Sequence, residues 1–293
     1  VTGVSITGIT KAGTGNLHLE RVNMTQNFYY NLSVGSASIL CEIISCTWQA
    51  YGGNYSHSSS STTADIRVLN SRFYKDPAHV GSQASRHMFY IGPGNNVHIE
   101  NCYFHNTTNG AAIKIDGSDE TIPQHARVMG CTFANGVNWG IEGAHNVLTE
   151  VSNCHFYSFY GVYQMHDLLV ANCYFETTGA AVFWTNPNFH TSNSNCRFKG
   201  TKASLEIKTG GNRVRVSNCD FDDAGVATEG AGQGCWLWLD NCTFIGRYVA
   251  DPESGAIYAL NDYESHIYLS NCHFSGVYKW AALNNGDDLA GMC

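Results

Sequence analysis

The chain has 293 residues, of which 14% are charged, and its 16 basic and 24 acidic side chains leave a formal net charge of −8. Nucleic-acid binding depends on clustered Lys and Arg that neutralise phosphates, so this acidic balance argues against nucleic acid as a partner. No apolar run reaches the roughly 18 residues of a membrane-spanning helix, and we therefore expect no membrane insertion.

A short signature with the consensus N-C-x-F recurs along the chain. The copies are, in chain order, RVNM (21–24), ISCTW (44–48), LNSRF (69–73), ENCYF (100–104), MGCTF (129–133), SNCHF (152–156), ANCYF (171–175), SNCRF (194–198), SNCDF (217–221), DNCTF (240–244) and SNCHF (270–274). The ten intervals between the last residues of these copies average 25 residues. An internal repeat of this length indicates a solenoid.

The residues between the copies have the pattern of short strands. Apolar and polar residues alternate, as in Val214-Arg-Val216 and Ile267-Tyr-Leu269, which is strand periodicity. No stretch sustains the periodicity of a helix. The sequence therefore predicts an all-β fold, a parallel β-helix (solenoid) of about eleven coils, as a single domain over residues 1–293.

Stacked coils would place the signature residues in three ladders of Phe, Cys and Asn. Cys and Phe are two residues apart and point inward, whereas Asn lies at the turn before the strand and can hydrogen-bond to the next coil. Parallel Cβ atoms about 4.8 Å apart are too distant for disulfides, so we expect reduced thiols and folding in a reducing compartment. A straight column cannot surround a metal tetrahedrally, and we expect no metal site and no cofactor.

Three segments depart from the regular repeat of the coils. Residues 51–63 are a Ser-rich polar stretch, and residues 74–96 contain Pro77, Pro93 and three Gly. We expect both to be loop excursions, which commonly carry recognition on a rigid scaffold. The end of the chain, residues 280–293, has no polar cap in its sequence. We expect that the coil pattern fades out in this segment or that the segment docks on another structure.

The N-C-x-F coils with their Asn ladder resemble the right-handed parallel β-helix proteins of the pectin-lyase-like superfamily, over about residues 15–280. The resemblance implies three strands per coil and sugar-binding grooves along an outer face. The same fold serves polysaccharide lyases, glycosidases, epimerases, bacteriophage tailspikes and adhesins. No catalytic motif of the superfamily is found in the sequence, so whether the chain is an enzyme stays open.

The strand after each signature gives a first set of outward residues, the downstream stripe. It contains Lys114, Glu142, Tyr163, Phe183, Glu206, Ala227 and Tyr258. Carboxylates interleaved with aromatic rings suit carbohydrate, and Tyr163, Phe183 and Tyr258 are candidate sugar contacts. Glu142 and Glu206 lie three coils apart, about 14 Å, too far to cooperate as glycosidase carboxyls. Pairs one coil apart could cooperate, namely Asp116 with Glu142 or Glu206 with Glu229; the alternative is that these are solvated surface charges.

The outward residues of the signature strand form the signature stripe. It contains Tyr103, His155, Tyr174, Arg197, Asp220 and His273. Arg197 and Asp220 are on adjacent coils, which predicts a surface salt bridge worth less than about 1 kcal/mol. His155, Tyr174 and Arg197 are also candidates for the acid, base and charge-neutralising groups of a lyase.

The strand before the Asn turn gives a third set, the upstream stripe. It contains His98, Arg127, Glu150, Leu169, Arg215, Trp238 and Tyr268, with Trp236 and His266 beside them. Alternation places Leu237 and Leu239 inside, so Trp236 and Trp238 face outward. Two outward Trp next to a Tyr either contact sugars or pack against another subunit, and aromatic anchors are typical of interface centres.

The leading hypothesis is a bacteriophage tailspike-like virion protein that binds a cell-surface polysaccharide. In a second form of this hypothesis the protein also cleaves the polysaccharide. The reduced Cys ladder favours it, because virion proteins fold in the host cytoplasm before the tail is released. The resemblance implies a homotrimer. The alternatives are a secreted, extracellular polysaccharide lyase or glycosidase, and a non-enzymatic structural or adhesive β-helix that forms filaments.

Overall fold

The computed structural model describes most of the chain. The described residues are 9–12, 15–27, 30–35, 40–50, 53–57, 65–75, 87–93, 96–105, 110–116, 124–134, 137–143, 147–164, 167–184, 190–200, 203–207, 211–229, 235–247, 255–260, 266–277 and 280–284. They contain 34 strands and no helix. Three strands per coil give about eleven coils, and the predicted all-β parallel β-helix is confirmed. No helix in this part of the chain could span a membrane.

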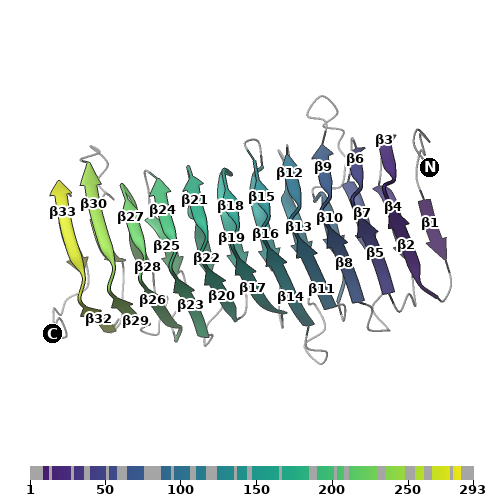
Figure 1. Ribbon diagram of the computed structural model, residues 1–293. Helices are drawn as coiled ribbons and strands as arrows, with labels where there is room; N and C mark the ends of the chain where they lie inside the picture. The colour runs from purple at the N-terminus through teal and green to yellow at the C-terminus, as the bar shows by residue number, and fades with distance from the viewer. Residues whose placement is uncertain are drawn as a thin grey trace. The chain divides into compact units, whose positions relative to one another are not determined.

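Two compact units divide the chain, Val1–Glu150 and Val151–Cys293, which we call unit 1 and unit 2. In unit 1 every third strand belongs to the same parallel sheet (Figure 1). The downstream sheet contains β1 (Ile9–Ala12), β4 (Tyr30–Gly35), β7 (Gly53–His57), β10 (Phe89–Ile91), β13 (Ala111–Ile115) and β16 (Trp139–Gly143). The upstream sheet contains β2 (Leu17–Glu20), β5 (Leu40–Ile44), β8 (Asp65–Leu69), β11 (Asn96–Glu100) and β14 (Gln124–Met129). The signature sheet contains β3 (Asn23–Asn27), β6 (Thr47–Ala50), β9 (Arg72–Lys75), β12 (Tyr103–His105) and β15 (Thr132–Phe133).

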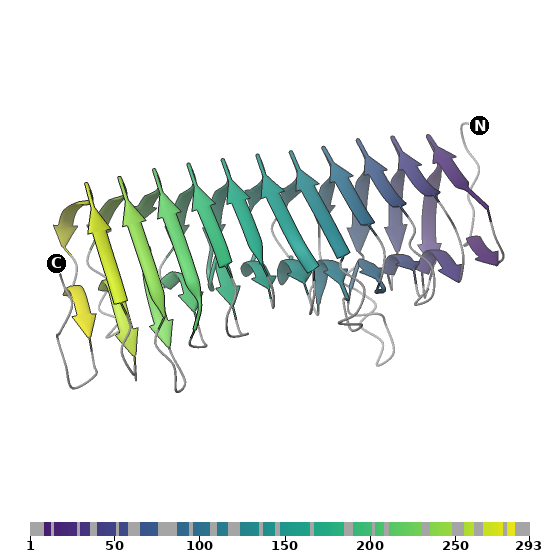
Figure 2. The same ribbon diagram turned by 90° about the horizontal axis from the view of Figure 1, so that it is seen from below.

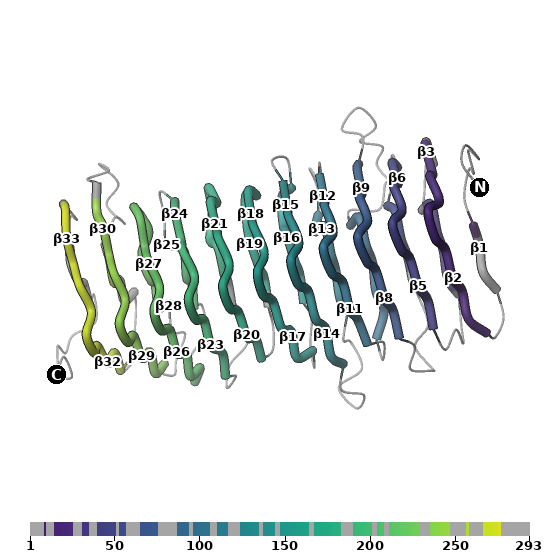
Figure 3. The backbone as a smooth tube through the Cα atoms, in the orientation of Figure 1, coloured from purple at the N-terminus to yellow at the C-terminus, as the bar shows by residue number. Residues whose placement is uncertain are grey.

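Unit 2 repeats this arrangement, and its successive coils can be followed in Figures 2 and 3. Its downstream sheet contains β19 (Tyr160–Gln164), β22 (Val182–Trp184), β25 (Ala203–Ile207), β28 (Gly225–Glu229), β31 (Gly255–Leu260) and β34 (Trp280–Asn284). Its upstream sheet contains β20 (Leu168–Ala171), β23 (His190–Ser194), β26 (Arg213–Ser217), β29 (Trp236–Asp240) and β32 (His266–Ser270). Its signature sheet contains β18 (His155–Phe156), β21 (Tyr174–Thr177), β24 (Arg197–Gly200), β27 (Asp220–Asp222), β30 (Thr243–Arg247) and β33 (His273–Val277). Strand β17 (Val147–Ser152) spans the boundary between the units.

The Phe ladder forms the core of unit 2. Phe156, Phe175, Phe198, Phe221 and Phe244 are fully buried, because alternation along each signature strand turns them inward. Neighbouring rings in this column stack with centroids 4.6–5.1 Å apart. Since the parallel register places each Phe directly opposite the next, the predicted ladder is confirmed.

The Cys ladder consists of thiols and not of disulfides in the described part of the chain, as predicted. Each sulfur lies near the carbonyl two residues earlier; Cys154 Sγ is 3.2 Å from Ser152 O, and Cys196 Sγ is 3.2 Å from Ser194 O. Burial raises the pKa of the Cys46 thiol above its usual value. The thiols therefore act as small buried side chains that also satisfy turn carbonyls.

The backbone conformation of the turn explains why Asn recurs in the Asn ladder, and the repeat alone did not reveal this. Its eight Asn residues have φ between 51° and 54°, the left-handed region that Asn tolerates better than most residues. Gly130 takes the same turn position with φ 60°. Side-chain bonds between coils are also present, since Asn241 Nδ2 donates to Asn218 Oδ1 at 2.8 Å. Asn is thus selected by the turn conformation as well as by the ladder.

Asn195 offers a test of this interpretation, because its φ is 52°. We expect Asn195→Ala to lower the free energy of unfolding by about 1 kcal/mol, since Ala pays the full steric penalty of the left-handed region. Asn195→Gly should cost less, because Gly has no Cβ. Urea unfolding of both variants measures the difference. Equal losses for Gly and Ala would show that the amide, and not φ, determines the choice of residue.

The predicted loop excursions are only partly loops. Residues 53–57 form β7, in which buried Tyr55 packs against Phe89 with ring centroids 5.3 Å apart. Residues 74–75 belong to β9 and residues 89–91 form β10. The prediction was wrong at these positions because the Ser-rich and Gly-rich flanks concealed short inward-facing stretches. Residues 51–52, 58–63, 76–86 and 94–95 lie outside the described residues, as do residues 285–293, while 280–284 form β34.

Candidate functional site

The upstream sheet of unit 2 carries an open groove of about 610 Å³ on its outer face. We call it the Arg–Trp groove, and its lining residues are Leu169, His190, Thr191, Ser192, Arg213, Arg215, Trp236, Trp238 and Tyr268. Strands β20, β23, β26, β29 and β32 provide these residues in consecutive register. Leu237 and Leu239 are buried, so the prediction that Trp236 and Trp238 face outward is confirmed.

Two stacked columns cross the groove from strand to strand. Arg213 Cζ lies 5.8 Å from the Trp236 ring centroid, and the other neighbour of Trp236 is His266, with ring centroids 5.6 Å apart and planes 19° apart. Arg215 Cζ lies 5.6 Å from the Trp238 centroid, and Tyr268 stacks at 5.5 Å and 8°. These distances are within the range of cation–π contacts. Each Trp is therefore flanked by an Arg on the strand before it and by a stacked ring on the strand after it.

Arg213 and Arg215 have no carboxylate partner among the described residues. Within the described part of the chain, no carboxylate lies at ion-pair distance from Arg213 or Arg215, and both are exposed. A guanidinium in a cation–π contact still carries five N–H donors, which can bond to a ligand. The groove therefore presents positive charge and hydrogen-bond donors on a chain whose formal charge is −8.

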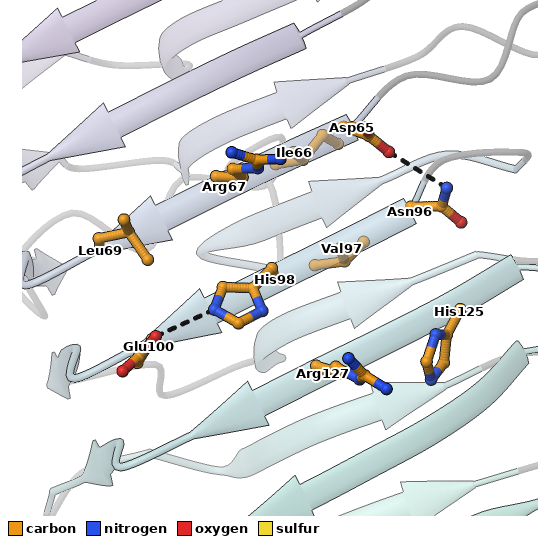
Figure 4. A pocket seen from close by; sticks show the side chains of 10 residues that line it. All are labelled: Asp65, Ile66, Arg67, Leu69, Asn96, Val97, His98, Glu100, His125 and Arg127. Atoms are coloured by element: carbon orange, nitrogen blue, oxygen red, sulfur yellow. Dashed lines mark hydrogen bonds and ion pairs between the residues drawn. The ribbon is translucent and has the colours of Figure 1, made fainter.

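The upstream sheet of unit 1 carries a second groove of about 500 Å³, which differs in its electrostatics (Figure 4). Arg67, His98 and Arg127 stand on β8, β11 and β14 as Figure 4 shows. Arg127 Nε donates to Glu150 Oε2 at 2.8 Å, and Arg67 Nη1 lies 3.7 Å from Glu42 Oε1. His98 Nε2 lies 3.0 Å from Glu100 Oε2. Here Arg67, His98 and Arg127 each have a carboxylate neighbour.

The pKa of Glu150 reflects the ion pairs and hydrogen bonds of the unit 1 groove. Partial burial acts to raise the pKa of Glu150, but hydrogen bonds from Arg127 and His125 outweigh burial and lower that pKa. The ionised form of Glu150 is therefore favoured, and its carboxylate is engaged with Arg127 and His125. The charged groove of unit 1 is an ion-pair network, which is less suited to hold a charged ligand than the Arg–Trp groove.

The predicted carboxylate pair of unit 1 is held apart by other partners. Glu142 is opposite Lys114 in register and forms a close ion pair with its ammonium, and His87 Nδ1 is 3.7 Å from Glu142 Oε2. Asp116 accepts a hydrogen bond from the Tyr90 hydroxyl at 2.7 Å. Asp116 directly follows β13 and comes two residues after Lys114, which is the register partner of Glu142 on β16. Their catalytic role stays a prediction.

The predicted carboxylates of unit 2 have the same offset. Glu206 is opposite Ala227, whereas Glu229 comes two residues later, opposite Leu260. The downstream register places Tyr163, Phe183 and Glu206 opposite one another on β19, β22 and β25. The side chains of Phe183, Glu229 and Tyr258 lie outside the described part of the structure, and the roles of all these residues stay predictions.

The signature stripe of unit 2 is in the predicted register, with His155, Tyr174 and Arg197 on adjacent strands. The His155 and Tyr174 rings lie 6.0 Å apart. The predicted salt bridge to Asp220 was wrong, because Arg197 Nη2 lies 3.6 Å from Asp222 Oδ2. The Arg side chain reaches along the strand to a nearly buried carboxylate, whose charge benefits more from a cation than that of exposed Asp220.

Sequence reasoning missed a charged cluster beside that stripe. Lys199 Nζ lies 2.8 Å from Glu176 Oε1, and the Tyr174 hydroxyl donates to Glu176 Oε2 at 2.9 Å. Those two hydrogen bonds lower the pKa of Glu176, while desolvation and the bond to Glu176 raise the pKa of Tyr174. The catalytic roles of His155, Tyr174 and Arg197 stay predictions.

Sequence reasoning also missed Arg213 and His190 in the Arg–Trp groove. The signal was present, because Arg213-Val-Arg215 precedes Trp236-Leu-Trp238 by one repeat of 23 residues. Aligning the repeats would have placed each Arg beside a Trp. Among the described residues, no group of three or more His, Cys, Asp or Glu is arranged to hold a metal ion.

Comparison with known proteins gives one family. A family model described as the right-handed β-helix region matches residues 62–221. The match covers more than half of the chain and extends from the residues before β8 into β27, thus including the Arg-bearing strand β26. No curated protein matches the chain.

Proposed function

Since the chain belongs to the family of right-handed β-helix regions, we propose that it binds a polysaccharide in the Arg–Trp groove of unit 2. Membership of this family supports a role in binding carbohydrate, in acting on polysaccharide, or as a structural β-helix. A flat sheet face that repeats every coil matches a ligand that also repeats, because each sugar unit can meet an equivalent set of side chains. The groove runs across five strands of such a face.

The observation that carries the proposal is the pair of stacked Arg–Trp columns. Tyr268 and Leu169, at opposite ends of the groove, are each 44% exposed, and the two Trp and two Arg lie between them. Exposed aromatic and apolar groups beside charged hydrogen-bond donors are typical of binding sites and not of an inert surface. No comparable observation favours cleavage, since Glu142 and Glu176 are held in ion pairs.

Within this function, a tailspike-like virion protein that recognises a cell-surface polysaccharide remains our specific proposal. The thiols of the Cys ladder support it, because such a chain is expected to fold in a reducing host cytoplasm. This proposal includes a homotrimer. Sedimentation of the full chain tests the trimer, and a stable monomer would count against the virion assignment without bearing on the groove.

The binding proposal is tested with a glycan array and purified polysaccharides. We expect the full chain to retain at least one polysaccharide, and Trp238→Ala to weaken that binding about tenfold, because the substitution removes both the ring and the support of Arg215. Phe159→Ala is the matched control, since Phe159 is 47% exposed on the connection between β18 and β19, outside the groove. Equal binding by the two variants, with unchanged melting temperatures, would exclude this groove.

A further inference from the structure

We propose that the Arg–Trp groove selects acidic polysaccharides, whose carboxylate or sulfate groups bind the N–H edges of Arg213 and Arg215. This inference rests on the proposed function and adds the chemical class of the ligand. It follows from how the rings and guanidinium groups are stacked and from the charge around them.

Stacking leaves little ring face for a sugar. Sugar C–H groups usually pack on an open aromatic face, but both neighbours of Trp238 along its column are occupied, by Arg215 and Tyr268. Trp236 is likewise placed between Arg213 and His266. Rings stacked in this way direct their edges toward solvent. An aromatic edge is the positive part of the ring quadrupole, and it favours electron-rich oxygen atoms over C–H groups.

The two arginines are held ready for an anion. Arg213 and Arg215 are two residues apart on β26, so their Cα atoms are about 7 Å apart and their side chains point to the same side. The cation–π contacts with Trp236 and Trp238 restrain both guanidinium groups, which lowers the entropy lost when a ligand binds. A guanidinium edge binds a carboxylate or a sulfate through two parallel hydrogen bonds.

The contrast with unit 1 shows that this charge is not a general property of the upstream sheets. Arg67 and Arg127 occupy the equivalent outward positions in unit 1 and each has a glutamate partner. In the Arg–Trp groove the register neighbours of Arg213 are His190 and Trp236, and those of Arg215 are Ser192 and Trp238, so none of these positions carries a carboxylate. A neutral sugar would leave both guanidinium groups without a counter-charge, whereas an acidic sugar supplies one.

The experiment compares polymers that share a backbone and differ in charge. Polygalacturonic acid is compared with its methyl ester for the carboxylate arm, and dextran sulfate with dextran for the sulfate arm, by biolayer interferometry on the full chain. We expect at least one acidic polymer to bind about tenfold more tightly than its neutral form and to weaken as ionic strength rises. The Arg213→Gln/Arg215→Gln variant should lose that preference and keep its melting temperature.

Arg21→Gln/Arg72→Gln is the matched control, because it removes two exposed positive charges outside the groove. It should keep the preference for the acidic polymer, and loss of the preference in this control would indicate non-specific attraction and overturn the inference. Equal binding of acidic and neutral forms, with binding still lost in Trp238→Ala, would overturn the inference and leave the proposed function standing. Absence of binding to every polymer would overturn both. Single-stranded oligothymidylate that binds more tightly than either acidic polymer would also overturn the inference.

Discussion

Phe198→Ala is expected to lower the free energy of unfolding by about 3–5 kcal/mol. Phe198 is fully buried in the middle of the Phe ladder of unit 2, between Phe175 at 5.1 Å and Phe221 at 4.9 Å. Removing its ring leaves a cavity and breaks two stacked contacts, and the flanking coils are too regular to collapse into the space. Chemical denaturation followed by tyrosine and tryptophan fluorescence measures the loss.

Two variants separate ladder packing from a general effect of losing an aromatic ring. Phe198→Leu keeps most of the volume and is expected to cost less than Phe198→Ala. Phe159→Ala removes an exposed ring and should change the free energy of unfolding by less than about 1 kcal/mol. A Phe198→Ala variant as stable as Phe159→Ala would contradict the buried ladder.

Asn193→Val is expected to raise the free energy of unfolding by about 1–3 kcal/mol. Asn193 is 0% exposed on the inner face of β23, and neither polar atom of its amide has a hydrogen-bond partner among the residues that the structure describes. Its register neighbours are Val170 and Val216, both buried. The substitution therefore places Val between two buried Val residues. It also removes an amide that is desolvated in the folded protein. Thermal and urea unfolding of the variant measure the gain.

Thr191→Val is the matched control on the same strand. Thr191 is also buried, but its hydroxyl donates to Leu168 O at 2.9 Å. Because this substitution removes a satisfied hydrogen bond, we expect it to be neutral or to destabilise by about 1 kcal/mol. An Asn193→Val variant less stable than the parent would show that the amide is bonded, and would contradict this account of the core.

The fold could be predicted from the sequence because the residues that recur in each repeat are the ones that face inward. Phe198 and Cys196 recur at equivalent positions since stacked coils impose the same environment on each copy. Alternation then gave the outward direction of Trp236 and Trp238. The left-handed turn was not predicted, because an Asn ladder and a positive φ select the same residue; Ser45, with φ 54°, shows the backbone requirement without the amide.

The candidate site could be predicted only where it depends on strand register. The outward Trp pair followed from alternation, whereas the Arg213–Trp236 contact required the repeats to be aligned. Long charged side chains defeated the prediction elsewhere. Lys199 bonds to its direct register partner Glu176, a pair that aligned repeats would have given, but Arg197 reaches Asp222 and not the opposite Asp220. Such side chains span several positions, so sequence spacing does not determine their partners.

Hydroxyl-radical footprinting with mass spectrometry, with and without the polysaccharide that binds most tightly, tests the location of the site most directly. We expect ligand to reduce the oxidation of Trp236, Trp238 and Tyr268 and to leave His155 and Tyr174, on the signature sheet, unchanged. Protection of His155 and Tyr174, or of Tyr163 on the downstream sheet, with no protection of the two Trp, would contradict the assignment of the Arg–Trp groove.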